Sequence, residues 1–183
     1  MIDLALVTDA SDEPITTNEA KNYLRIDSDL TDDDDLISMM IKSARLAVEK
    51  VCGGLCILPQ TWLQSQDFGG SVIDFYKQPV TDVSYVVGVG IDGVRTTIAE
   101  GNGYRYTKEE LISKNGAFSD AVYELQYTAG KFTATGSVSS DIKMAMLQIV
   151  AFWYQNRDQY YELTIPKAVF PMLSHLRVAV SLL

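Results

Sequence analysis

Two cysteines are the first residues whose spacing could hold a metal ion. Cys52 and Cys56 lie four positions apart in the segment Cys-Gly-Gly-Leu-Cys. A structural zinc site needs four ligands, but the sequence has no third cysteine, and its one histidine, His175, lies more than a hundred residues downstream. Because free cysteine usually packs as a small apolar residue, we expect two reduced, buried thiols and no metal site.

Four consecutive aspartates, Asp32 to Asp35, form the second group with possible metal chemistry. Carboxylates bind Ca²⁺ and Mg²⁺, but the run lacks the alternating ligands and central glycine of a calcium loop. Acidic residues at the start of a helix stabilise it by about 0.3–1 kcal/mol each. Apolar residues at helical spacing follow the run, so we interpret it as a helix N-terminus.

No group of residues has the pattern of a catalytic or cofactor site. His175 is the one candidate for a general base near neutral pH, but no acid or nucleophile clusters beside it, and we expect a surface or capping histidine. Gly88-Val89-Gly90 lacks both the third glycine and the following helix of a nucleotide fingerprint. The sequence therefore predicts no catalytic residue, no cofactor and no enzyme.

Composition narrows the class of protein further. The 183 residues are 47% hydrophobic and 21% charged, which is typical of a single globular domain, here 1–183. A net charge of −9 disfavours direct nucleic-acid binding, which needs basic side chains. No stretch reaches the roughly 18 apolar residues of a membrane span, and the N-terminus lacks the basic region of a signal peptide. We expect an intracellular protein that does not contact a membrane.

Helical patterns occur at both ends of the chain. Thr16 and Glu19 have the spacing of a capping box and predict a short helix that ends near Arg25. Apolar positions from Leu36 to Val51 recur every three or four residues, which predicts an amphipathic helix stopped by Gly53-Gly54.

The same period returns in the C-terminal part of the chain. It runs from Ile142 to Trp153, and Pro166 then favours a last helix that continues to Val180. The helical parts are thus 15–55 and 139–183.

The middle of the chain, about 60–130, has β-branched and aromatic runs punctuated by glycine and proline. Asp92-Gly93 predicts a hairpin turn, and we expect a helical turn over Lys108 to Lys114. The fold class is therefore α+β, a small helical bundle with a β-rich insertion. The predicted strands are Thr61 to Asp67, Val72 to Tyr76, Val83 to Val89, Arg95 to Ile98, and Val122 to Tyr127.

The order of these pieces resembles the head-tail connector (adaptor) family of tailed bacteriophages and prophages. No single piece is specific, and the resemblance depends on their order and spacing over most of the chain. The landmarks are Ile15 to Asp27, the Asp-rich helix entry, Ala44 to Lys50, Thr61-Trp62, Gln78-Pro79-Val80, Tyr127 to Gly130, the helix from Asp141, and Trp153 to Arg157.

The resemblance implies a structural role in virion assembly. Such subunits form an oligomeric ring of about twelve copies, closed by head-to-tail contacts. The ring docks on the portal protein at the capsid vertex, joins a tail or head-completion protein, and lets DNA pass without sequence-specific binding. The expected location is the virion head-tail junction, and the host cytoplasm during assembly. The alternatives are another neck or tail-completion protein, or a small cytoplasmic ligand-binding domain or enzyme.

Candidate interface residues lie near the C-terminus. Aromatic residues and arginine are enriched at interfaces, although Arg157 could equally be a solvated charge at a helix end. The apolar end of the chain is either a partner surface or part of the core. The candidates are Trp153, Tyr154, Arg157, Val178, Val180, Leu182 and Leu183.

Overall fold

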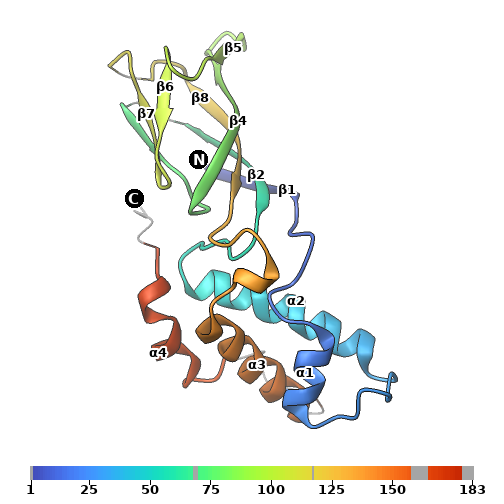
Figure 1. The fold of residues 1–183 in the computed structure, drawn as a ribbon. Helices are drawn as coiled ribbons and strands as arrows, with labels where there is room; N and C mark the ends of the chain where they lie inside the picture. Colours follow the sequence, from blue (N-terminus) through green and yellow to red (C-terminus); the bar gives the residue numbers. More distant parts are fainter. Residues whose placement is uncertain (1, 68–69, 117, 158–164, 179–183) are drawn as a thin grey trace. The chain divides into compact units, whose positions relative to one another are not determined.

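The structure is a computed structural model that describes residues 2–67, 70–116, 118–157 and 165–178. The chain forms two compact units, one helical and one built from β-strands (Figure 1). The helical unit comprises Ser11–Leu58 and Phe132–Val178, and the β unit comprises Pro59–Lys131 and the described residues of Met1–Ala10. The assignment of one domain, 1–183, stays a prediction.

The helical unit begins with α1 (Thr17–Leu24), which has the predicted capping box. Thr16 Oγ1 accepts a hydrogen bond from the Glu19 backbone N–H at 3.1 Å, and Glu19 Oε2 accepts one from the Thr16 N–H at 2.7 Å. Helix α2 (Asp34–Val51) has two aspartates in its first turn, which confirms that the acidic run starts a helix. Gly53, at φ +77°, follows the end of α2 as expected.

Helix α3 (Ser140–Gln155) packs against α2, α1 contacts both, and α4 (Val169–Leu173) packs against α3. The buried faces have the predicted spacing of three and four residues, so the apolar stripes close one core. No helix of the described residues is long and apolar enough to cross a membrane. The core includes Ile37, Ile41, Ala44 and Val48 of α2, and Ile142, Ala145, Ile149 and Trp153 of α3.

The last helix is much shorter than predicted. Helix α4 ends at Leu173, a 3₁₀ turn follows over Ser174–Leu176, and the chain is extended at Arg177. The Val178 N–H then donates to the Cys52 carbonyl at 2.9 Å. This contact with the end of α2 takes a donor that a continuing helix would use internally, so the prediction of a helix to Val180 was wrong.

The β unit contains two antiparallel sheets, and every strand predicted from the sequence is present. Burial alternates along β8, as expected for a strand with one face in the core. The α+β class is therefore confirmed. The larger sheet has the order β1 (Ile2–Thr8), β2 (Gln60–Asp67), β8 (Val122–Ala129), β4 (Val80–Val89), β5 (Arg95–Ile98), and the smaller sheet has the order β3 (Val72–Asp74), β7 (Glu110–Ser113), β6 (Tyr104–Tyr106).

Three strands differ from the sequence-based expectation. Strands β1 and β6 were not predicted, and the helical turn expected over Lys108 to Lys114 is wrong because β7 occupies this segment. Leu111 is buried and β7 pairs with strands on both sides, so distant partners override local propensity. The hairpin at Asp92-Gly93 is confirmed, with the Gly93 N–H bonded to the Gly90 carbonyl at 2.9 Å.

Candidate assembly interface

The end of α3 holds three of the predicted interface residues. Trp153 is 7% exposed and packs into the helical core. The Tyr154 hydroxyl donates to Asp33 Oδ2, and Arg157 Nη1 lies 3.2 Å from the same oxygen. The Arg157 guanidinium also lies 5.0 Å from the centre of the Tyr154 ring. We call Asp33, Tyr154 and Arg157 the Asp33 clamp, because they join the start of α2 to the end of α3.

The clamp changes the acid–base behaviour of its own members. The hydrogen bond from Tyr154, helped by Arg157, holds the pKa of Asp33 below its usual value. The same bond to a carboxylate raises the pKa of the Tyr154 hydroxyl. Arg157 is thus already paired within its own chain, with Asp33 and with the Tyr154 ring. The role of Tyr154 and Arg157 at an interface stays a prediction.

The remaining candidates lie in the C-terminal segment. Val178 is half-buried and bonded to the end of α2, whereas Val180, Leu182 and Leu183 lie outside the described residues. His175 lies on the surface, as predicted, and its Nε2 is 2.9 Å from Asp141 Oδ2.

The two groups considered for metal chemistry lie at the two ends of α2: the aspartate run starts the helix, and the cysteines lie at and just beyond its end. Cys52 and Cys56 are buried thiols that form no disulfide within the described residues, as predicted. Within residues 2–67, 70–116, 118–157 and 165–178, no three His, Cys, Asp or Glu side chains come together as a metal site.

The carboxyl of Asp141, the partner of His175, has a lowered pKa. Burial alone would raise this pKa, but hydrogen bonds from Ser139 and from the Ile142 and Asp141 backbone outweigh the effect of burial.

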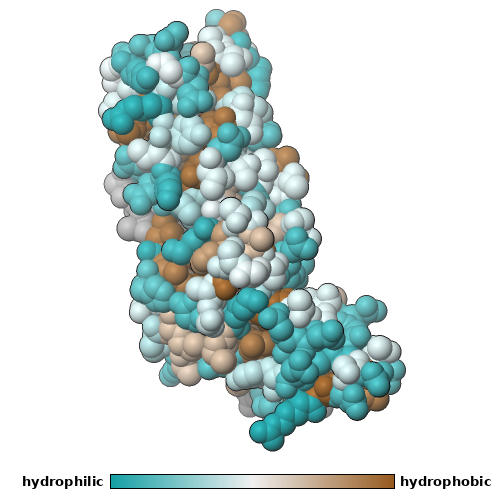
Figure 2. Space-filling view, viewed as in Figure 1, coloured by the Kyte–Doolittle hydropathy of each residue, from teal (hydrophilic) through white to brown (hydrophobic). Residues whose placement is uncertain are grey.

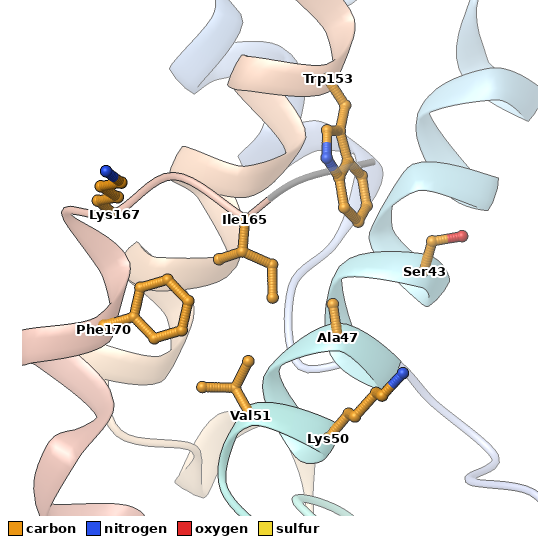
Figure 3. Close-up of a pocket in the computed structure, with 8 residues that line it drawn as sticks. All are labelled: Ser43, Ala47, Lys50, Val51, Trp153, Ile165, Lys167 and Phe170. Carbon is orange, nitrogen blue, oxygen red and sulfur yellow. The ribbon is translucent and has the colours of Figure 1, made fainter. Parts of the chain in front are cut away.

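An apolar pocket of about 770 Å³ lies beside Trp153 in the helical unit (Figure 3). The side chains of Val51, Trp153, Ile165 and Phe170 face a common space, and Lys50 and Lys167 extend their nitrogen atoms away from it. Such a concave apolar surface with charged groups at its edge suits the burial of an apolar side chain from a partner. The lining residues are Ser43, Ala47, Lys50, Val51, Trp153, Ile165, Lys167 and Phe170.

Of the predicted interface residues, Trp153 lines this pocket, and the other lining residues were not predicted from the sequence. A signal for part of it exists, because Ser43, Ala47 and Lys50 recur at helical spacing as two small residues followed by a base. Residues 165–170 reach the pocket only through the fold, and their local sequence gives no indication of it.

The outward face of α3 is uncharged and partly apolar. No charged residue occurs between Met144 and Asn156, and the side chains of Met144 and Phe152 are 41% and 39% exposed. Leu147 and Ala151 lie half-buried between them. An uncharged, partly apolar outer face is unusual for a surface helix and typical of helices that contact a partner.

Comparisons with known proteins identify a matching family. A family model described as "Head completion protein" matches residues 13–165. No curated protein matches the chain.

Solved structures share the fold over nearly the whole chain. A chain of the "Neck of empty GTA particle computed with C6 symmetry" is 18% identical, with a TM-score of 0.80 and coverage of 98% of this chain and 97% of that chain. A chain of the "Virion of native gene transfer agent (GTA) particle" is 20% identical, with a TM-score of 0.77 and the same coverage. For the "Neck of native GTA particle computed with C12 symmetry" the values are 17% and 0.76, again with 98% and 97% coverage.

Proposed function

This chain belongs to the head completion protein family, and from that premise we propose that it is a ring-forming structural subunit of the connector at a virion head-tail junction. The family match over residues 13–165 is the observation that carries the proposal. The fold shared with chains of gene transfer agent necks supports it. In this role the chain positions other proteins and catalyses no reaction.

The proposed assembly is a ring of about twelve copies, as in a neck with C12 symmetry. The ring docks on the portal protein, joins a tail or head-completion protein, and surrounds the path of the DNA. A net charge of −9 suits a wall along which DNA slides, because tight phosphate binding needs basic side chains. The uncharged outer face of α3 provides a surface for contacts between neighbouring subunits.

The test is assembly of the purified chain alone and with portal protein. Light scattering across a concentration series, followed by negative-stain imaging, should show rings with a central opening, either free or on portal particles. A chain that stays monomeric at every concentration and is not captured by portal protein contradicts the proposal.

A further inference from the structure

The loop between α1 and α2 exposes one apolar side chain among acids. Leu30 is 59% exposed, and Asp27, Asp29 and Asp32 around it are exposed as well. Figure 2 shows the surface over this loop as mainly hydrophilic, with small hydrophobic spots. A single exposed leucine is ordinary, so its meaning depends on how the loop is held and what it could fit.

A buried lysine holds the backbone of this loop in place. Lys21 is 1% exposed, and its Nζ donates to the carbonyls of Ser28 at 2.9 Å and Leu30 at 2.7 Å. The same nitrogen lies 2.9 Å from Asp34 Oδ1. The backbone of Leu30 is therefore held in place before any partner binds, which lowers the entropy cost of inserting its side chain into a pocket.

The pocket beside Trp153 has the complementary chemistry. Its interior is apolar, and its exposed lysines, Lys50 and Lys167, have no carboxylate partner among the described residues. On a chain with a net charge of −9, two such lysines beside an apolar pocket favour an occupant that combines an apolar side chain with acids. Leu30 with Asp29 and Asp32 is such a group.

The loop leads into the first turn of α2 (Figure 1), whereas the α2 residues that line the pocket belong to the second half of this helix. Ala47 follows Asp34 by 13 residues, which is about 20 Å along the helix. Because Lys21 holds the backbone of Leu30 before α2, the Leu30 side chain does not reach Ala47 of its own chain. Two different, complementary surfaces on one chain give a head-to-tail contact, which closes into a ring when the rotation between copies allows.

We propose that Leu30 of one copy inserts into the pocket of the next copy, with Asp29 and Asp32 facing Lys50 and Lys167. This inference rests on the proposed ring and names the two surfaces that form it. It predicts a directional, head-to-tail contact, because each copy uses its loop at one side and its pocket at the other.

Disulfide trapping tests this directly. The variant Leu30→Cys/Ala47→Cys should form a reducible ladder of dimers, trimers and larger species under mild oxidation. An equal mixture of the two single variants should stop at dimers, since each chain then has one reactive surface. The control Leu30→Cys/Met39→Cys places a thiol at an exposed site of α2 that does not line the pocket, and it should form no ladder. The native cysteines, Cys52 and Cys56, are buried and are expected to stay unreactive in every variant.

Charge reversal provides an independent test of the same contact. Lys50→Glu/Lys167→Glu and Asp29→Lys/Asp32→Lys should each weaken assembly by more than about tenfold, because like charges then meet. The variant that carries all four substitutions should recover assembly, because opposite charges meet again. A misfolded chain would not recover.

The outcomes separate the two proposals. Wild-type rings without a ladder in the Leu30→Cys/Ala47→Cys variant, or with an equal ladder in the Met39→Cys control, overturn the contact and leave the ring. Dimers from Leu30→Cys alone overturn it in favour of a symmetric contact. A chain that gives neither a ladder nor rings, even with portal protein present, overturns both.

Discussion

The two units bury different kinds of polar side chain. The helical unit buries charged groups, whereas the β unit buries neutral amides. A buried ion must be paired to be tolerated, whereas an amide needs only donors and acceptors at hydrogen-bond distance. The helical unit should therefore be the more sensitive of the two to the loss of one partner. The charged group comprises Lys21, Arg45 and Glu49, and the amides are Gln60, Gln64, Gln66 and Gln78.

Arg45 is the centre of the charged group. Its Nε lies 2.8 Å from Glu13 Oε2, and its Nη1 lies 3.5 Å from Glu49 Oε2. Glu49 Oε1 in turn accepts a hydrogen bond from the Ile57 N–H at 3.0 Å. The three side chains therefore join α2 to the segment before α1 and to the segment that follows α2.

The largest effect is expected from Arg45→Met. This change keeps the volume but leaves Glu49 buried without its cation, so the free energy of unfolding should fall by about 3–5 kcal/mol. Urea unfolding followed by circular dichroism measures it. Lys42→Met, on the exposed side of the same helix, is the matched control and should cost less than about 1 kcal/mol. Equal losses in both variants would show that burial of the charge is irrelevant.

Two glycines with nearly the same backbone angle compare the units directly. Gly53 has φ +77° in the helical unit, and Gly93 has φ +79° in the β unit. A Cβ at Gly53 would lie 2.7 Å from the Val178 carbonyl oxygen, whereas a Cβ at Gly93 would meet nothing within 4 Å. The two positions therefore share backbone strain and differ in steric conflict.

Gly93→Ala should cost about 1–2 kcal/mol from its left-handed conformation. Gly53→Ala should cost about 2–4 kcal/mol, since it adds displacement of the Val178 backbone to the same strain. Thermal and urea unfolding of both variants measure the difference. Equal costs would mean that the chain around Val178 moves without resistance.

The β unit is tested at Gln64, whose side chain is fully buried. Its Nε2 donates to Gln66 Oε1 at 2.8 Å and to the Asp74 carbonyl at 2.9 Å. Its Oε1 accepts from the Tyr76 N–H at 3.1 Å and from the Tyr127 hydroxyl at 2.9 Å. One amide thus links β2, β3 and β8.

Gln64→Met should lower the free energy of unfolding by about 1–3 kcal/mol, because it leaves buried donors and acceptors unpaired without leaving a charge. Gln126→Met, at a half-buried position of β8, is the control and should cost less. A loss at Gln64 larger than the loss at Arg45 would reverse the comparison between the two units.

Elements with a strong local period could be predicted from the sequence. The stripes of α2 and α3 and the alternation of β8 are local patterns, and the structure confirms them. The end of α4 depends on a bond between Val178 and Cys52, and β7 depends on pairing with β3 and β6. Such non-local contacts have no periodic signal, so both segments were predicted wrongly.

The family could be predicted from the sequence, whereas most of the candidate site could not. The resemblance to head-tail connectors came from the order of landmarks, and the match to the head completion family confirms it, as it does the structural role at a head-tail junction. Trp153 is an interface candidate from the sequence because aromatic residues beside Arg157 could anchor a partner, and it lines the pocket. The pocket itself could not be predicted, since Phe170 and Ala47 meet only after folding. The pinned conformation of Leu30 depends on Lys21, whose burial contradicts the usual exposure of lysine.

The smallest effect is expected at the Asp33 clamp, which lies at the surface and depends on pH. The pKa of the Asp33 carboxyl is lowered in the folded state. The stabilising contribution of the clamp is therefore complete above the pKa of about 4 that Asp33 has in the unfolded chain, and it is lost as pH falls through the lowered pKa. Asp33→Asn removes this contribution at every pH. The difference in unfolding free energy between wild type and variant should therefore be constant above about pH 5 and shrink below about pH 4.

Two further variants identify the cause of that difference. Tyr154→Phe removes the larger influence on the pKa of Asp33, and Arg157→Gln removes a smaller one, so the pH profile should flatten more in the first variant. Urea unfolding between pH 3 and pH 7 gives all three profiles. A larger change in Arg157→Gln would mean that charge, rather than the hydrogen bond from Tyr154, dominates the clamp. In that case salt should weaken the clamp strongly, because exposed ion pairs are screened, whereas a clamp held by the Tyr154 hydroxyl should be much less sensitive to it.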